Sequence, residues 1–104
     1  MSGWTPGPWG VSDLFADFVK DSDGGRIADC RIDGETTEQT IANARLIAAA
    51  PDLAEALRCL SAEVNGLHAF ERAFREVYGN SNWEALQHQA SKARAALAKA
   101  RGEA

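Results

Sequence analysis

The spacing of apolar residues changes once along this chain, close to Glu35. Before that point apolar and polar residues alternate in "LFADFVK" (14–20) and "RIADCRI" (26–32), which is the period of half-buried β-strands. After it, apolar residues recur every three or four positions, which is the period of amphipathic α-helices. The sequence therefore predicts an α+β fold, in which a β-hairpin or three-stranded antiparallel sheet is followed by three to four α-helices.

The predicted hairpin closes at "DSDGG" (21–25), because Asp-Gly between two apolar runs favours a tight turn. A third strand at the edge of the sheet is expected in "WGVSD" (9–13). A helix over residues 12–20 is the alternative, since apolar residues there also fall at helical intervals. The residues expected to share the inner faces of the two strands are Leu14, Ala16, Phe18, Ala28, Cys30 and Ile32.

The first ten residues are predicted to be extended. Pro6 and Pro8 fix their own φ angles and push the residues before them away from the helical region, so "TPGPW" (5–9) does not form a helix. Trp4 and Trp9 flank this stretch. They either pack over the open face of the sheet or stack against a ligand.

The segment "NARLIAAAPDLAEAL" (43–57) resembles a single amphipathic helix, yet it carries Pro51 near its middle. Proline lacks a backbone N–H and clashes with the carbonyl four residues earlier, so an unbroken helix is excluded without a kink. In the first turn of a helix proline is tolerated, and Asp52 beside it favours a helix start. We therefore expect two helices that meet at Ala50–Pro51, or one helix bent there.

Further signals divide the helical part. Thr36 with Gln39, and Ser81 with Glu84, form the capping boxes expected at two helix starts. Gly66 is the expected end of the second helix, in the left-handed conformation that glycine adopts easily, and "GNSN" (79–82) ends a helix over residues 67–78. The residues predicted to face inward on the first three helices are Ile41, Ala44, Ile47 and Ala48, then Leu53, Leu57, Leu60 and Val64, then Phe70, Phe74 and Val77.

The last helix carries a heptad-like seam. Its members are Trp83, Leu86, Ala90, Ala93, Leu97 and Ala100. The small alanines would allow a neighbouring helix to approach closely. That neighbour is either a helix of the same chain or a second copy, and the second case would give a homodimer through the 82–101 helix.

The length of 104 residues suits a single domain (1–104), with an extended segment and hairpin over residues 1–35 and a helical part over residues 36–104. No apolar run approaches the roughly 20 residues that span a bilayer, and the N-terminus lacks the features of a secretory signal. The expected compartment is therefore the cytoplasm. There Cys30 and Cys59 are expected to be free thiols that pack as small buried residues.

Residues suited to catalysis or metal binding are few. His68 and His88 are expected on helix surfaces, and neither has the histidine four residues away that a metal-binding helix needs. "DSDGG" resembles the start of a calcium loop, but the fifth and twelfth positions are Gly25 and Ile32, which supply no side-chain ligand. No nucleophile elbow or glycine-rich phosphate loop occurs. The sequence therefore predicts no enzyme, no metal site and no cofactor.

The net charge of −4 is unevenly distributed: residues 1–35 carry −4, residues 36–66 carry −2 and residues 67–104 carry +2. Direct nucleic-acid binding is not predicted, because it requires a much stronger basic surface. The acidic residues of the first part either face a basic partner, as in a mimic of nucleic-acid phosphates, or are solvated charges on a small sheet. They are Asp17, Asp21, Asp23, Asp29, Asp33 and Glu35.

Arg45 is the one basic residue in an otherwise apolar helix, and Asn43 lies close to it in the sequence. The two residues either anchor a phosphate or a partner carboxylate, or form hydrogen bonds to the adjoining hairpin.

Three motifs, "TPGPW" (5–9), "GGRIAD" (24–29) and "ANARLIAAAPDLAEAL" (42–57), together resemble those of a widespread set of small phage and prophage accessory proteins. The resemblance covers roughly the first 60 residues, and no catalytic residue is associated with these motifs. It implies an accessory protein of a bacterial virus that acts in the host cytoplasm. Many such proteins bind and inactivate a host factor, as anti-CRISPR proteins do.

The leading hypothesis is therefore a non-enzymatic protein that inhibits a bacterial host factor, most simply a component of a defence system, by protein–protein interaction. That target could itself be a complex that binds nucleic acid. The residues expected to contact the partner are Asp17, Asp21, Asp23, Asp29 and Trp83. One alternative is a binder of a nucleotide signal that uses Trp4, Trp9 and Arg45, and another is a structural or regulatory homodimer.

Overall fold

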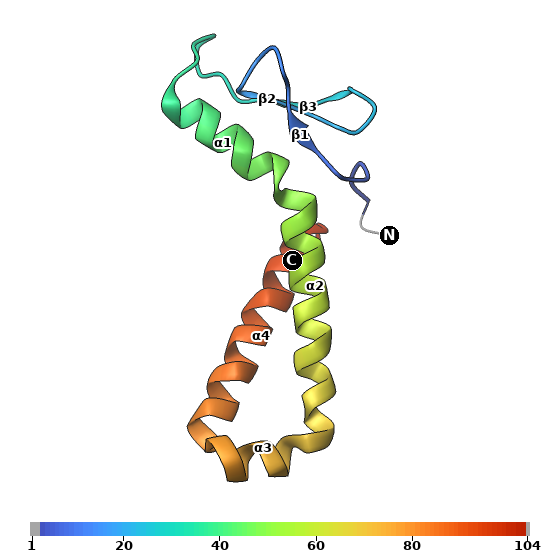
Figure 1. The fold of residues 1–104 in the computed structure, drawn as a ribbon, viewed down its shortest axis with the longest axis vertical. Coiled ribbons are helices and arrows are strands. Elements are labelled where there is room, and N and C mark those ends of the chain that lie inside the picture. Colours follow the sequence, from blue (N-terminus) through green and yellow to red (C-terminus); the bar gives the residue numbers. More distant parts are fainter. Residues whose placement is uncertain (1–2, 104) are drawn as a thin grey trace. The chain divides into compact units, whose positions relative to one another are not determined.

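The computed structural model describes residues 3–103 of the chain (Figure 1). Met1 and Ser2, which belong to the predicted extended segment, and Ala104 lie outside the described residues. The chain divides into two compact units, Gly3–Leu53 and residues 54–103, which we call the sheet unit and the helical unit. The single domain over residues 1–104 stays a prediction.

The elements follow the order that the sequence predicts. The sheet unit contains β1 (Gly10–Val11), β2 (Phe18–Lys20), β3 (Arg26–Asp29) and α1 (Glu38–Ala48). Next comes α2 (Ala50–Gly66), which continues into the helical unit, followed by the short 3₁₀-helix η1 (Leu67–Phe70), α3 (Glu71–Tyr78) and α4 (Asn80–Ala100). The predicted α+β fold is confirmed.

The three strands form one antiparallel sheet in the order β1-β2-β3. β1 confirms the predicted edge strand, with Gly10 opposite Lys20 and Val11 opposite Val19. Val19 also lies opposite Ala28 of β3, and a bulge follows between Val19 and Lys20. Such a bulge bends the strand and increases its local twist.

The first predicted strand is shorter than its alternation indicated, because residues 12–17 form a turn rather than a strand or a helix. The Ser12 hydroxyl accepts hydrogen bonds from the backbone N–H groups of Leu14 and Phe15, at 3.2 and 3.4 Å. The Ser12 N–H donates to the carbonyl of Phe18 at 2.9 Å. Local bonds of this kind compete with strand pairing. Leu14, predicted to face inward, is instead 85% exposed.

The turn between β2 and β3 confirms the predicted hairpin. Asp21 organises it, because its Oδ1 accepts hydrogen bonds from the N–H groups of Asp23 and Gly25, at 2.9 and 2.8 Å. Its own N–H donates to the carbonyl of Gly25 at 2.8 Å. Gly24 adopts a positive φ of 87°, which glycine accommodates without strain. Asp21 is therefore a turn-forming residue.

One face of the sheet packs on α1. Val19 is fully buried against Ala44 and Ala48, which confirms the inward stripe predicted for α1. Partly buried residues that complete this core are Trp9, Val11, Ile27, Ala28, Cys30 and Ile47. Ile32, also predicted to face inward, lies beyond β3 and is exposed.

α1 starts one residue later than predicted. Its N-cap is Thr37, whose hydroxyl accepts a hydrogen bond from the Thr40 N–H, while the Thr40 hydroxyl accepts one from the Thr37 N–H. The capping box over Thr36 and Gln39 was therefore wrong. Thr36 is instead drawn into a tertiary hydrogen bond to Asp17.

The break at Pro51 is confirmed. α1 ends at Ala48 and α2 starts at Ala50, so Pro51 lies in the first turn of α2, where proline is tolerated. Gly7 of the N-terminal segment packs directly against it: a Cβ on Gly7 would lie 2.8 Å from the Pro51 Cβ. Two of the motifs that suggest a phage family, "TPGPW" and "NARLIAAAP", therefore contact each other in the fold.

In the helical unit η1 and α3 join α2 to α4, and α4 runs back in the direction opposite to α2 (Figure 1). The inward positions of α2 are Ala54, Leu57, Ser61 and Val64, of which Ser61 and Val64 are buried. Leu60, predicted to face inward, is 61% exposed, and Leu53 at the end of the sheet unit is also exposed. The inward face predicted for α2 is therefore rotated about the helix axis relative to the face that the structure buries.

The seam of α4 is largely confirmed as an inward face. Trp83, Ala90 and Leu97 are buried, and Leu86 and Ala93 are partly buried. The face predicted for residues 67–78 was mostly wrong, since Phe70 and Val77 are exposed and Phe74 is half-buried.

The ends of these helices also differ from prediction. Gly66 ends α2 as expected, but with a right-handed φ of −63°, so the chain turns directly into η1. α4 begins after Gly79, whose φ is 90°, and no side chain caps it, so the predicted capping box of Ser81 with Glu84 was wrong.

Candidate functional site

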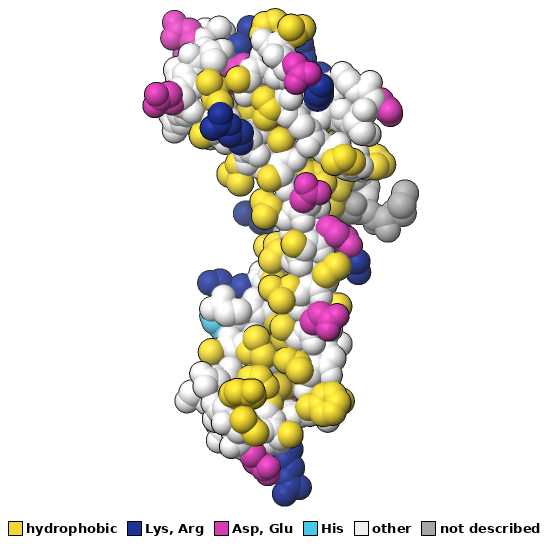
Figure 2. All heavy atoms as spheres, viewed as in Figure 1, with side chains coloured by type: hydrophobic (Ala, Val, Ile, Leu, Met, Phe, Trp, Pro, Cys, Tyr) yellow, Lys and Arg dark blue, Asp and Glu magenta, His cyan; other side chains and the backbone are white. Residues whose placement is uncertain are grey.

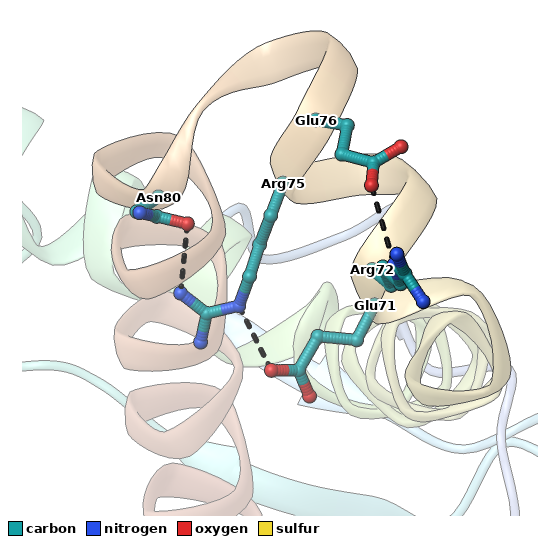
Figure 3. A pocket seen from close by; sticks show the side chains of 5 residues that line it. All are labelled: Glu71, Arg72, Arg75, Glu76 and Asn80. Carbon is teal, nitrogen blue, oxygen red and sulfur yellow. Dashed lines mark hydrogen bonds and ion pairs between the residues drawn. The ribbon is translucent and has the colours of Figure 1, made fainter.

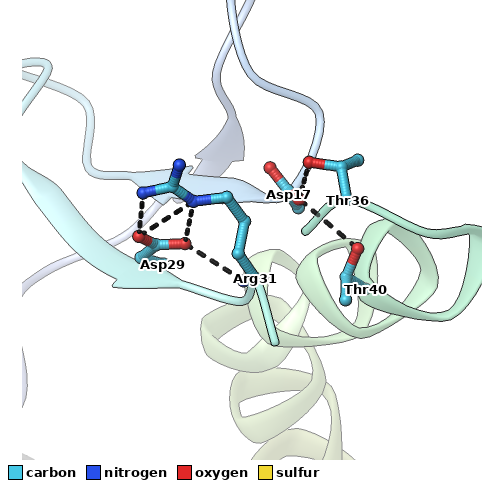
Figure 4. Close-up of polar contacts among 5 residues, drawn as sticks. All are labelled: Asp17, Asp29, Arg31, Thr36 and Thr40. Carbon is cyan, nitrogen blue, oxygen red and sulfur yellow. Dashed lines mark hydrogen bonds and ion pairs between the residues drawn. The ribbon is translucent and has the colours of Figure 1, made fainter. Parts of the chain in front are cut away.

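Asp17 does not lie on an acidic surface. It is 1% exposed, and its carboxylate accepts hydrogen bonds from the hydroxyls of Thr36, at 2.6 Å, and Thr40, at 3.3 Å (Figure 4). The backbone carbonyl of Asp17 also accepts a hydrogen bond from the Cys30 N–H at 2.9 Å. Asp17 therefore links the sheet to the start of α1.

Asp29 is held by a neighbouring base. The Arg31 guanidinium donates to both carboxylate oxygens, with the shortest contact 2.8 Å, and the Arg31 N–H adds a further bond at 3.0 Å (Figure 4). These hydrogen bonds lower the pKa of Asp29 to about 2. With Asp21 engaged in the turn, Asp23 is the member of the predicted acidic set that lies exposed at the tip of the hairpin.

The outer face of the sheet carries a cationic layer that sequence reasoning missed. Phe18 of β2 is buried, and the guanidinium groups of Arg26 and Arg31 lie over its ring, 4.5 and 4.8 Å from the centroid. Such stacking is favourable because the aromatic face is electronegative. The alternation of β3 indicated that Arg31 points away from the core, but nothing in the sequence paired it with Phe18.

Beside this layer, the turn at residues 12–15 presents an apolar side chain to solvent. Leu14 projects freely, while Phe15 is half-exposed and stacks on Phe18 at 4.8 Å between centroids. The Ser12 hydroxyl and the Phe15 carbonyl, which accepts from the Phe18 N–H at 3.1 Å, hold the turn in place. We call residues 12–15 the Leu14 loop. Leu14 and the half-exposed Phe15 together offer apolar area that a protein partner could cover.

The residues predicted for a nucleotide ligand have separate structural surroundings. Trp9 packs against the core, and its indole N–H donates to the Thr5 carbonyl at 3.1 Å. Trp4 is half-buried, and Arg45 is exposed on α1. A role of these three residues in ligand binding stays a prediction.

Trp83, predicted to contact a partner, lies in the first turn of α4 and is 3% exposed. His68 and Phe74 meet its ring edge-on, at 5.4 and 5.3 Å between centroids, and the Arg75 guanidinium lies 5.7 Å from it. Its side chain therefore serves the packing of α4 against η1 and α3.

A shallow hollow lies on the surface near α3. Arg75 donates to Glu71 at 2.8 Å and to Asn80 at 3.2 Å, and Arg72 donates to Glu76 at 3.3 Å (Figure 3). Both guanidinium groups thus already contact carboxylates of the same helix, so the hollow presents no free positive charge to an anionic ligand.

The cysteines differ in their surroundings. Both are free, but Cys59 is exposed on α2, which corrects the prediction that both are buried. Cys30 is partly buried against the core, and this burial raises the pKa of its thiol, with smaller contributions from Asp17 and Asp29. His68 and His88 are exposed, as predicted.

Within residues 3–103 no group of three or more potential metal ligands comes together. The part of the chain that the structure describes also holds no helix long and apolar enough to cross a membrane.

The fold and this surface define a small α+β protein with an exposed apolar loop beside a cationic layer. Comparison with known families identifies the family: the chain belongs to the one described as Salmonella phage P22 protein Y8K6, whose model matches residues 1–104. It is thus a phage protein, as its motifs had suggested. No curated protein and no solved structure was found to match the chain.

Proposed function

We propose that this phage protein acts in the host cytoplasm by binding a bacterial protein, and that its target is a component of a defence system, as for an anti-CRISPR protein. It acts without catalysing a reaction. The observation that supports this proposal is the Leu14 loop, where a leucine that is 85% exposed projects from a well-ordered turn. The phage family is a second support.

The Leu14 loop suits protein recognition for physical reasons. An apolar side chain that enters a pocket on the partner gains free energy by leaving water, and a pre-ordered turn loses little entropy on binding. Charges of both signs surround it, since Asp13 is almost fully exposed and Arg26 lies on the adjacent outer face. Charged residues at the rim of such a contact favour specificity.

In this proposal fewer of the predicted acidic residues contact the partner. Asp17 is buried and Asp21 is engaged in the turn, so Asp23 at the hairpin tip and Asp29 with its partner Arg31 are the members that a basic partner could reach. Their contribution would add to that of the Leu14 loop.

A plating assay tests the function. The protein is expressed in a host that carries a defence system and in an isogenic host without it, and both are challenged with a phage that the system restricts. We expect wild-type protein to restore plaque formation on the defended host alone. Leu14→Glu should abolish the restoration, whereas Leu46→Glu, at a leucine of α1 that is 65% exposed, should retain it.

The same variants test the mechanism. Immobilised wild-type protein and Leu46→Glu should retain one host protein from a lysate, and Leu14→Glu should lose it. Restoration that is equal for all three proteins would contradict a role of the Leu14 loop. No restoration by any of them, across the defence systems tested, would contradict the anti-defence function.

A further inference from the structure

The helical unit exposes large apolar side chains that its own fold leaves uncovered. They are Leu60 on α2, Phe70 at the end of η1, and Val77 and Tyr78 at the end of α3. Figure 2 shows hydrophobic side chains gathered over α2 and α3. The buried residues among positions 54–103 are Ser61, Val64, Trp83, Ala90 and Leu97. A core this small supplies little stability, and units of this size commonly gain the rest by oligomerisation.

The charges on the two long helices indicate what covers this surface. α2 carries three acids and one base, a net charge of −2, and its base, Arg58, already pairs with Glu55 at 2.6 Å. α4 carries Lys92, Arg94 and Lys99 against Glu84, a net charge of +2. Within the described residues, none of these four α4 charges forms an ion pair, and neither do Asp52 and Glu63 of α2.

We propose that a second copy of this chain covers Leu60 and the exposed sides of the two long helices, with α2 of one copy against α4 of the other. A two-fold interface is self-complementary, so one acidic and one basic helix in the same chain would meet their opposites twice. Two antiparallel helix pairs then form a four-helix bundle.

The exposed side of α4 can receive the exposed leucine of α2. Ala85, Ala95 and Ala96 are exposed there, and small side chains allow a neighbouring helix to approach closely. Leu60 from the other copy would thereby leave water, while Glu63 one turn further along α2 would come within reach of Lys92, which shares the face of Ala85 and Ala96.

This interface differs from the homodimer that the sequence alone suggests. That dimer would use the seam of α4, yet Trp83, Ala90 and Leu97 of the seam are already buried within the chain. The two-fold contact proposed here uses the outer faces of α2 and α4. It is independent of the Leu14 loop, which belongs to the sheet unit.

Sedimentation equilibrium of the full chain tests the proposal. We expect the mass to rise with concentration to twice the 11.2 kDa of one chain. Leu60→Glu should raise the dimer dissociation constant about tenfold or more, since a charge would then be buried at the contact. Leu46→Glu, on α1 of the sheet unit, is the matched control and should dimerise as wild type.

Charge reversal gives a second readout on exposed positions, where the fold is expected to tolerate substitution. Glu63→Lys and Lys92→Glu should each weaken the dimer, and the two changes together should restore it. Far-UV circular dichroism checks that every variant keeps its helices. The proposal is overturned if wild type stays a monomer at the highest concentration reached, which would leave the face for another protein. It is also overturned if Leu60→Glu dimerises like wild type, or if the double variant dimerises no more strongly than the single ones.

Discussion

The contacts that stabilise the sheet unit differ in kind from those that stabilise the helical unit. In the sheet unit, residues far apart in the sequence contact each other directly. The Asp17 carboxylate accepts hydrogen bonds from the Thr36 and Thr40 hydroxyls, and Gly7 packs on Pro51. In the helical unit the ion pairs join residues within the same helix or turn, such as Arg58 with Glu55. Isolated pairs of that kind contribute little to stability.

The difference shows that contacts between residues distant in the sequence help to determine the fold of the sheet unit. Two of the motifs on which the predicted resemblance to phage proteins rests meet in the sheet unit, and their contact gives them a structural reason to occur together. Both units leave large apolar residues exposed, five in the sheet unit and four in the helical unit, and such residues suit surfaces that a partner completes. Four measurements would break or sharpen this comparison.

The largest effect is expected from Asp17→Ala. The change removes a buried carboxylate that accepts hydrogen bonds from the Thr36 and Thr40 hydroxyls, and with it the side-chain link between the sheet and the start of α1. The free energy of unfolding should fall by about 3 kcal/mol, since hydrogen bonds to a charged group are among the stronger ones. Urea denaturation of the full chain measures it. Asp13→Ala, at an exposed aspartate of the same unit, should change stability by less than about 0.5 kcal/mol. Similar losses for both variants would show that Asp17 is not the link between sheet and helix.

Gly7→Ala should have the next largest effect. The added methyl would lie 2.8 Å from the Pro51 Cβ, and neither the proline ring nor the helix start can move aside cheaply. Overpacking of this kind costs about 1–3 kcal/mol of unfolding free energy. Gly10→Ala is the matched control, because no atom lies within 4 Å of its added Cβ. If Gly7→Ala were as stable as that control, the contact between the two motifs would carry no structural weight.

The cysteines offer a comparison with one reporter in each unit. Cys30 of the sheet unit is partly buried and its thiol pKa is raised, so at neutral pH it holds less of the reactive thiolate. It should react with an aromatic disulfide reagent several-fold more slowly than the exposed Cys59, and its rate should keep rising as the pH increases. Cys30→Ser and Cys59→Ser variants assign the two phases. Equal rates would mean that Cys30 is as accessible as the exposed Cys59, which would contradict its packing against the core of the sheet unit.

Much of this architecture could be predicted from the sequence, because the spacing of apolar residues and the geometry of proline are local properties. The change of period near Glu35, the break at Pro51 and the inward seam of α4 all follow from them. The face of α2 could not be fixed in the same way. Leu53, Leu57, Leu60 and Val64 satisfy a helical period as well as Ala54, Leu57, Ser61 and Val64 do, and only the neighbouring helix selects between them.

The candidate surface was harder to predict, because it depends on contacts between distant residues. The sequence grouped the acids by proximity along the chain, whereas the fold buries Asp17 under α1 and pairs Asp29 with Arg31. Leu14 fitted a strand pattern, and the Ser12 hydroxyl that turns the chain away from that pattern gives only a weak local signal. The sequence therefore predicted a binding role from charge and missed the exposed leucine.

The smallest effect is expected from Gln87→Leu in the helical unit. The Nε2 of Gln87 is buried on α4 and has no hydrogen-bond partner among residues 3–103, which costs free energy in the folded state. A leucine of similar length removes the unsatisfied group and adds apolar contact with the interior, so the free energy of unfolding should rise by about 1 kcal/mol. Gln89→Leu, at an exposed position of the same helix, should leave it nearly unchanged. Thermal unfolding measures both variants. A higher free energy of unfolding for Gln87→Leu would show that the buried amide destabilises the helical unit. A lower one would mean that the Gln87 amide forms a hydrogen bond in solution and helps to fix the packing of α4.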